Sequence, residues 1–106
     1  MKNMIKELEE KKLLDYGFVS VKEYNGITVS TEPNDIYVYK ILPNLEVYGH
    51  FIFMENKLCF SAQMTIDKIH RGKFGAIYTD TIEIEHIINN VLYRYIEAKT
   101  DWLNKI

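Results

Sequence analysis

The sequence predicts an α+β fold, in which an antiparallel sheet of five consecutive strands lies between an N-terminal helix and a long C-terminal helix. Turn-forming pairs separate short segments rich in β-branched and aromatic residues: Asn25-Gly26, Pro43-Asn44 and Glu55-Asn56. Apolar and polar residues alternate within these segments, as in strands with one buried face. The segments at the two ends of the chain have helical composition or periodicity. A single domain over residues 1–106 follows from this length.

The turns give the expected strands their limits. A further turn, over Glu32–Asp35, completes the set because Pro33, Asn34 and Asp35 are all turn formers. The five expected strands cover roughly 18–24, 27–31, 36–42, 45–54 and 57–65. Phe74–Tyr78 is a candidate for a short sixth strand within a segment otherwise expected to be a surface loop.

A two-residue loop at Glu55-Asn56 sets the register of the neighbouring strands. It places Phe51 opposite Phe60, and directly opposed residues share a face of the sheet. The same face collects most of the large apolar residues: Leu45, Val47, Phe51, Phe53, Leu58, Phe60, Ala62 and Met64. Regular pairing across Pro43-Asn44 adds Ile36, Val38 and Leu42, and Lys40 as one polar residue. This face is the predicted core.

The opposite face carries aromatic and hydrogen-bonding residues. In the same register Tyr39 lies opposite Tyr48, and Tyr37 lies opposite His50. Such a mixture is enriched in contact surfaces. The residues expected to bind a partner are therefore Tyr37, Tyr39, Tyr48, His50 and Ile52. The alternatives are that the N-terminal helix covers this face as a second core layer, or that two copies meet through it.

The two helices have recognisable limits. Lys2–Leu14 is rich in good helix formers, and Gly17 then predicts a C-terminal cap on which Phe18 folds back. The C-terminal helix is expected over roughly 81–104, and Asp80 and Glu83 have the spacing of a capping box. We expect this helix to pack on the Phe51/Phe60 face and close the core.

Composition excludes several classes of protein. The net charge of −2 lacks the basic excess of a nucleic-acid binder, so direct nucleic-acid binding is not expected. No apolar run has the length of a membrane span, and the N-terminus does not resemble a signal peptide. The single cysteine fits a reducing, cytoplasmic environment. Abundant Ile, Lys, Asn and Tyr suggest an AT-rich genome, such as a low-GC bacterium or its phages and mobile elements.

Catalytic and metal-binding motifs are missing from the sequence. It contains no nucleotide-binding loop, zincin helix or nucleophile elbow, and its three histidines and one cysteine have no zinc-site spacing. We therefore expect no cofactor, no metal and no catalytic residue. The alternative is a small enzyme that uses His50 and Cys59, which lie diagonally on adjacent strands. The simpler interpretation is that both are structural sheet residues.

One segment concentrates positive charge. His70, Arg71 and Lys73 lie near Gly72 and Gly75 in the expected loop before the C-terminal helix. Backbone amides and basic side chains of this kind hold phosphates or acidic patches of partners. A small-ligand or phosphate-binding domain is therefore an alternative function, and an ordinary solvated loop is the alternative to any site.

These observations favour a small, non-catalytic protein-binding module. With the compositional hint, we expect a phage or mobile-element inhibitor of a host defence protein, such as an anti-CRISPR. Its partner would be a host protein, or a second copy in a homodimer, bound through the outer face of the sheet. We expect a variant with Tyr37→Ala and Tyr48→Ala to fold but to lose the partner.

Overall fold

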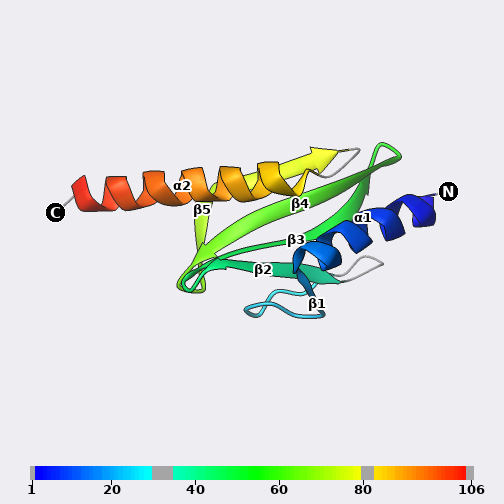
Figure 1. The fold of residues 1–106 in the computed structure, drawn as a ribbon, viewed down its shortest axis with the longest axis horizontal. Helices are drawn as coiled ribbons and strands as arrows, with labels where there is room; N and C mark the ends of the chain where they lie inside the picture. Colours follow the sequence, from blue (N-terminus) through cyan, green and yellow to red (C-terminus); the bar gives the residue numbers. More distant parts are fainter. Residues whose placement is uncertain (1, 30–34, 80–82, 105–106) are drawn as a thin grey trace.

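The computed structural model describes the backbone of residues 2–29, 35–79 and 83–104, and the side chains of 7–29, 35–69, 77 and 83–100. The chain has the expected α+β fold with an antiparallel sheet (Figure 1). Its elements follow one another as α1 (Lys2–Tyr16), β1 (Val19–Val21), β2 (Ile36–Leu42), β3 (Leu45–Met54), β4 (Lys57–Ile66), β5 (Ile69–Thr79) and α2 (Ile84–Asn104).

The sheet consists of four long strands and the three-residue strand β1, in the order β1-β2-β3-β4-β5. It differs from the expected meander at both edges. The described part of the expected strand 27–31 contains only an isolated bridge between Ile27 and Tyr24, and β1 pairs with β2 in its place. At the other edge, the expected surface loop is the eleven-residue strand β5.

The register between β3 and β4 is the expected one. Phe51 pairs with Phe60, and Val47 pairs with Met64. Glu55 and Asn56 have φ values of +52° and +65°, so the connection is a type I′ turn, whose twist matches that of the flanking strands. The prediction succeeds here because the turn and the hydrophobic pattern demand the same pairing.

The predicted register between β2 and β3 is wrong by one residue. Leu42 pairs with Leu45 as expected, but the next pair is Lys40 with Glu46, so Ile41 forms a β-bulge. Proline at position 43 explains this irregularity, because its φ is fixed near −65° and a type I′ turn needs a positive φ there. Beyond the bulge, every residue of β2 points to the face opposite to the expected one.

The bulge exchanges residues between the two faces. Tyr37 now pairs with Gly49, and Tyr39 pairs with Val47, so both tyrosines lie on the core face, which we define by Val47, Phe51 and Phe60. Lys40 leaves that face together with Ile36 and Val38, and this removes the one charged residue that the predicted register had placed in the core.

The buried apolar side chains of both helices, among those described, belong to the cluster on the core face. Ile87 and Val91 of α2 and Leu13 of α1 pack with Phe51 and Phe60. In Figure 1, α2 runs along the upper side of the sheet and continues past its left-hand end. The expectation that the C-terminal helix closes the core is confirmed.

Helix α1 ends as its sequence predicts, although two residues later. Gly17 has a φ of +127°, the Phe18 amide donates to the Leu13 carbonyl at 3.0 Å, and the Gly17 amide donates to the Leu14 carbonyl at 3.2 Å. These two bonds form a Schellman motif, and Phe18 folds back into the core beside Leu13. The hydroxyl of Tyr37 also donates a hydrogen bond to the carboxylate of Glu10 on α1.

Two expected features, the turn residues 32–34 and the Asp80 cap, lie outside the described residues. Within the part of the chain that the structure describes, neither helix is long and apolar enough to cross a membrane.

Candidate functional site

The second face of the sheet, opposite the core face, holds the candidate site. Part of it is covered by residues 22–29, which form a hairpin around a type I′ turn at Asn25 and Gly26, with φ values of +52° and +83°. The Tyr24 ring lies on the Tyr48 ring, with centroids 4.7 Å apart. We call this second apolar group the hairpin cluster, which comprises Tyr24, Ile36 and Tyr48 with Val21, Val29 and Val38 packed against them.

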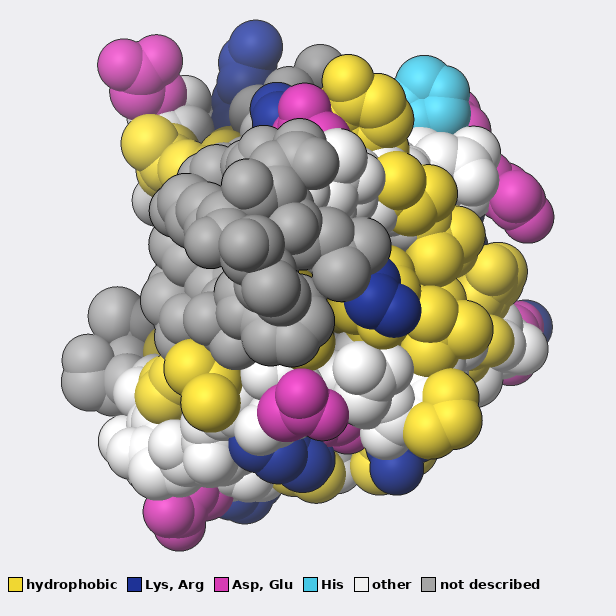
Figure 2. All heavy atoms as spheres, turned by 90° about the vertical axis from the view of Figure 1, so that its left-hand side faces the viewer, with side chains coloured by type: hydrophobic (Ala, Val, Ile, Leu, Met, Phe, Trp, Pro, Cys, Tyr) yellow, Lys and Arg dark blue, Asp and Glu magenta, His cyan; other side chains and the backbone are white. Residues whose placement is uncertain are grey.

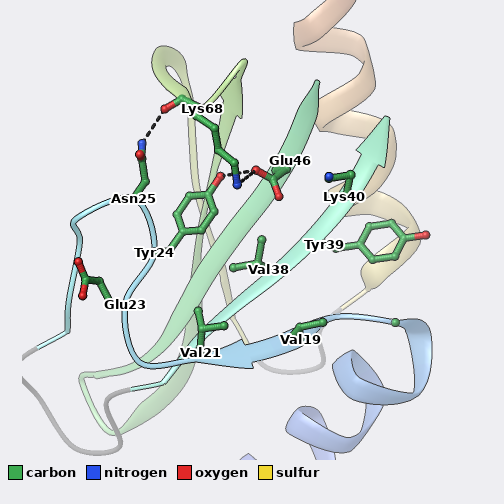
Figure 3. Close-up of a pocket in the computed structure, with 11 residues that line it drawn as sticks. Val19, Val21, Glu23, Tyr24, Asn25, Val38, Tyr39, Lys40, Glu46 and Lys68 are labelled. Carbon is green, nitrogen blue, oxygen red and sulfur yellow. Dashed lines mark hydrogen bonds and ion pairs between the residues drawn. The ribbon is translucent and has the colours of Figure 1, made fainter. Parts of the chain in front are cut away.

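A polar network with a buried centre fixes the hairpin to the sheet. The Tyr24 hydroxyl donates to Glu46 Oε1 at 2.9 Å and lies 2.7 Å from Thr65 Oγ1. Lys68 Nζ lies 2.6 Å from the same Glu46 oxygen and 5.0 Å from the centre of the Tyr24 ring. Asn25 Nδ2 donates to the Lys68 carbonyl at 2.6 Å, so two turns that are distant in sequence meet at this point (Figure 3).

The network keeps Glu46 ionised and Tyr24 protonated. Burial acts to raise the pKa of Glu46, but hydrogen bonds from Lys68 and Tyr24 and the charges of Lys68 and Lys40 outweigh it and hold that pKa below its usual value. Burial, aided by the carboxylate of Glu46, raises the pKa of Tyr24 to about 12 against the opposing hydrogen bond with Thr65. Glu46 is therefore a carboxylate at neutral pH, with the Tyr24 hydroxyl as its donor.

Sequence reasoning missed this network. It depends on a third type I′ turn, in which Asp67 and Lys68 have φ values of +54° and +65°. Neither residue is glycine, so the pair gave no turn signal beyond the tolerance of aspartate for this conformation. The turn starts strand β5 and places the Lys68 side chain over the second face.

A pocket of about 570 Å³ opens between the hairpin and strands β1 and β2 (Figure 3). Val19, Val21 and Val38 line its apolar part. Lys40, Glu46 and Lys68 line its charged part, together with Tyr24.

Beyond the hairpin, the second face has an open half, which we define as His50, Ile52, Met54, Ser61 and Ile77. His50 pairs with Ser61, and Ser61 pairs with Ile77 on β5, so these three form one row across the sheet. Ile77 is 53% exposed and Met54 is 46% exposed, whereas His50, Ile52 and Ser61 are half-buried. Burial lowers the pKa of His50, which favours the neutral imidazole.

The structure divides the five predicted partner-binding residues between the two faces. Tyr37 is fully buried on the core face, and Tyr39 is half-buried there, 5.2 Å from the Phe18 ring. Tyr48 lies on the second face, but it is buried under Tyr24 and donates to Gln63 Oε1 at 2.8 Å. Only His50 and Ile52 belong to the open half, so the expected tyrosine surface does not form.

His50 and Cys59 lie diagonally on adjacent strands, as expected, because His50 pairs with Ser61 and Ile52 pairs with Cys59. The Cys59 side chain is buried, and its Sγ lies 3.6 Å from the Lys57 carbonyl, to which the thiol donates. A nucleophile needs access to its substrate as well as a base within reach. The Cys59 thiol does not have that access in this structure.

The basic segment has a different setting from the expected loop. His70, Arg71 and Lys73 belong to strand β5, which pairs with β4, and their side chains lie outside the described residues. Among the residues whose side chains are described, no group of histidine, cysteine, aspartate or glutamate is placed to hold a metal ion.

Comparisons of the chain with protein-family models, with curated proteins and with solved structures found no match.

Proposed function

We propose that the chain is a small, non-catalytic protein-binding module whose contact surface is the open half of the second face. The observation that carries this proposal is a set of partly exposed apolar side chains on the second face, Ile52 and Met54 on β3 and Ile77 on β5. Half-buried His50 and Ser61 form one row with Ile77 across β3, β4 and β5, and they supply hydrogen-bonding groups. Exposed apolar side chains beside hydrogen-bonding groups are typical of protein interfaces.

The partner we propose is a host protein, which the chain would inhibit by occupying one of its surfaces. This follows the AT-rich composition of the sequence and the small size of the chain, as in anti-CRISPR and other anti-defence proteins. A heterologous partner is favoured over a second copy because obligate homodimers bury strongly apolar interfaces, whereas two of the five residues of the open half, His50 and Ser61, are polar.

Exposed hydrophobic side chains also occur elsewhere on the molecule. Figure 2, seen from the side toward which α2 points, shows a group of them beside acidic and basic side chains. On α2 itself, Tyr93 and Ile96 are 60% and 62% exposed. They are as apolar and at least as exposed as the open half, which makes them a matched control surface.

The test compares two double variants in a pull-down from a low-GC bacterial lysate. The sheet variant carries Met54→Glu and Ile77→Glu, and the control variant carries Tyr93→Glu and Ile96→Glu. We expect wild type and the control variant to capture the same protein and the sheet variant to lose it. Circular dichroism establishes that both variants are folded, as their exposed positions predict.

Binding of the captured protein is then measured with purified components. Substitution of central interface residues typically weakens binding about tenfold or more. Equal affinity of the sheet variant and wild type would reject the open half as the interface. Loss of binding in the α2 variant alone would move the interface to that helix.

A further inference from the structure

The pocket beside the hairpin cluster has no role in the proposed interface, although it is a built feature of the fold. Its walls come from separate parts of the chain: Gly17, β1, β2, β3, the 22–29 hairpin and the turn before β5. The Tyr24–Glu46–Lys68 network holds the hairpin and that turn in place. Its volume of about 570 Å³ is within the range of small-molecule sites, which is roughly 300–1,000 Å³.

The apolar part of the pocket is a platform of three valines. Val19 and Val38 are directly opposed across β1 and β2, and Val21 follows Val19 on the same face. Val19 is 59% exposed, although a β-branched apolar residue gains free energy on burial. A ligand with an aliphatic body would cover this surface without any rearrangement of the strands.

The charged part of the pocket is lined by two lysines, Lys40 and Lys68, and by two glutamates, Glu23 and Glu46. Lys68 is neutralised by Glu46, whose Oε1 lies 2.6 Å from its ammonium. Lys40 is a second cation, two residues beyond Val38 on the same face of β2. Figure 3 shows the Lys40 ammonium directed over the pocket toward Glu46, whereas the Glu23 carboxylate points away from the other labelled side chains.

We propose that this pocket binds a small free carboxylate with an aliphatic body. The aliphatic chain lies on Val19, Val21 and Val38, and the carboxylate accepts a charge-assisted hydrogen bond from Lys40. The walls formed by Tyr24 and Lys68 limit the length of the body, which favours a short chain over a long lipid. A cationic ligand is disfavoured because, of the two glutamates in the lining, Glu46 already pairs with Lys68 and Glu23 points away from the other labelled side chains (Figure 3).

The test is a titration of the isotope-labelled full chain with sodium octanoate, below its micelle concentration, followed by amide NMR. We expect saturable shifts centred on Val19, Val38 and Lys40. Octylamine has the same aliphatic body and the opposite charge, and acetate has the charge without the body. Each of them is expected to bind at least about tenfold more weakly than octanoate, since each lacks one of the two interactions.

Variants at Lys40, with a control variant at Lys57, distinguish binding in the pocket from non-specific adsorption of octanoate. Lys40→Gln is expected to weaken octanoate binding about tenfold, because it removes the charge from the hydrogen bond. Lys40→Arg, which keeps the charge, and Lys57→Gln, at the far end of β4, are expected to bind as wild type does. The absence of saturable shifts, equal binding of octylamine, or unchanged binding by Lys40→Gln would each overturn the proposal.

Discussion

Gly49 shows how closely the backbone approaches a side chain at one point of the core. It pairs with Tyr37 on one side and with Ala62 on the other. A Cβ atom at this position would lie 2.5 Å from the Ser61 carbonyl oxygen and 2.6 Å from Cζ of Phe60. Because Ser61 contributes backbone from the adjacent strand, the clash cannot be relieved by a side-chain rotation alone. The Phe60 ring therefore occupies the space that a side chain at position 49 would fill.

Gly49→Ala is expected to destabilise the protein by about 1–3 kcal/mol, the usual cost of overpacking a core. Urea denaturation followed by circular dichroism measures this change as a lower midpoint at an unchanged slope. Ser20→Ala, at an exposed position on β1, is the control. A loss of less than about 0.5 kcal/mol in the Gly49 variant would mean that Phe60 and β4 yield without strain.

Single residues also decide which parts of the candidate site were predictable. The predicted register placed the tyrosines on the outer face, but Tyr37 and Tyr48 are buried, and their hydroxyls donate hydrogen bonds to Glu10 and Gln63. The expected Tyr37→Ala and Tyr48→Ala variant would therefore leave cavities and lose its stability, so it cannot test binding. His50 and Ile52 were placed correctly because they follow the β3–β4 register.

At the scale of elements, one hairpin was predictable and its neighbour was not. Glu55 and Asn56 can both adopt the positive φ of a type I′ turn. The alternation of apolar and polar residues therefore sets the register, and β3 and β4 pair as expected. Pro43 cannot take the positive φ that a regular two-residue type I′ turn requires, so the predicted pairing of β2 with β3 fails. The sequence contained a signal of this conflict, because the regular register placed Lys40 on the core face.

Helix α1 depends on a few contacts for its position. Of its described apolar side chains, Leu13 is buried, whereas Leu8 and Leu14 are exposed. The Schellman motif fixes its C-terminal end, and the Tyr37–Glu10 hydrogen bond adds a polar attachment one turn earlier. Burial, together with the hydrogen bond to Glu10, raises the pKa of Tyr37, so its hydroxyl remains a donor at neutral pH.

Tyr37→Phe is expected to loosen α1 while the rest of the sheet stays in place. Loss of one hydrogen bond to a charged group costs about 1.5–3 kcal/mol, which corresponds to roughly 10-fold or faster amide exchange in the helix. Hydrogen-exchange NMR of the α1 amides measures it. Tyr48→Phe removes a hydroxyl that bonds to Gln63 on β4 and should leave α1 unchanged. Equal effects of the two variants on α1 would show that the attachment is apolar only.

At the scale of the whole molecule, one sheet carries two separate apolar groups on its two faces. The core face packs against both helices, and the hairpin cluster covers part of the second face. Buried tyrosines serve both groups: Tyr37 lies in the first, and Tyr24 and Tyr48 lie in the second. Their common dependence on a protonated hydroxyl gives the fold a shared sensitivity to alkaline pH.

Alkaline pH should therefore destabilise the protein before the tyrosines of the folded state ionise. Burial raises the pKa of Tyr24 to about 12 and also raises the pKa of Tyr48 and, with Glu10, that of Tyr37. In the unfolded chain these hydroxyls ionise near pH 10. Above that pH the unfolded state binds fewer protons than the folded state, so the free energy of unfolding falls as pH rises toward 12.

Urea denaturation at about pH 9 and at about pH 11 measures this fall in the free energy of unfolding. Tyr24→Phe should show a smaller fall than wild type, because it removes one raised pKa, whereas Tyr93→Phe, at an exposed position, should behave as wild type. An equal fall in wild type and in Tyr24→Phe would mean that Tyr24 does not couple ionisation to unfolding.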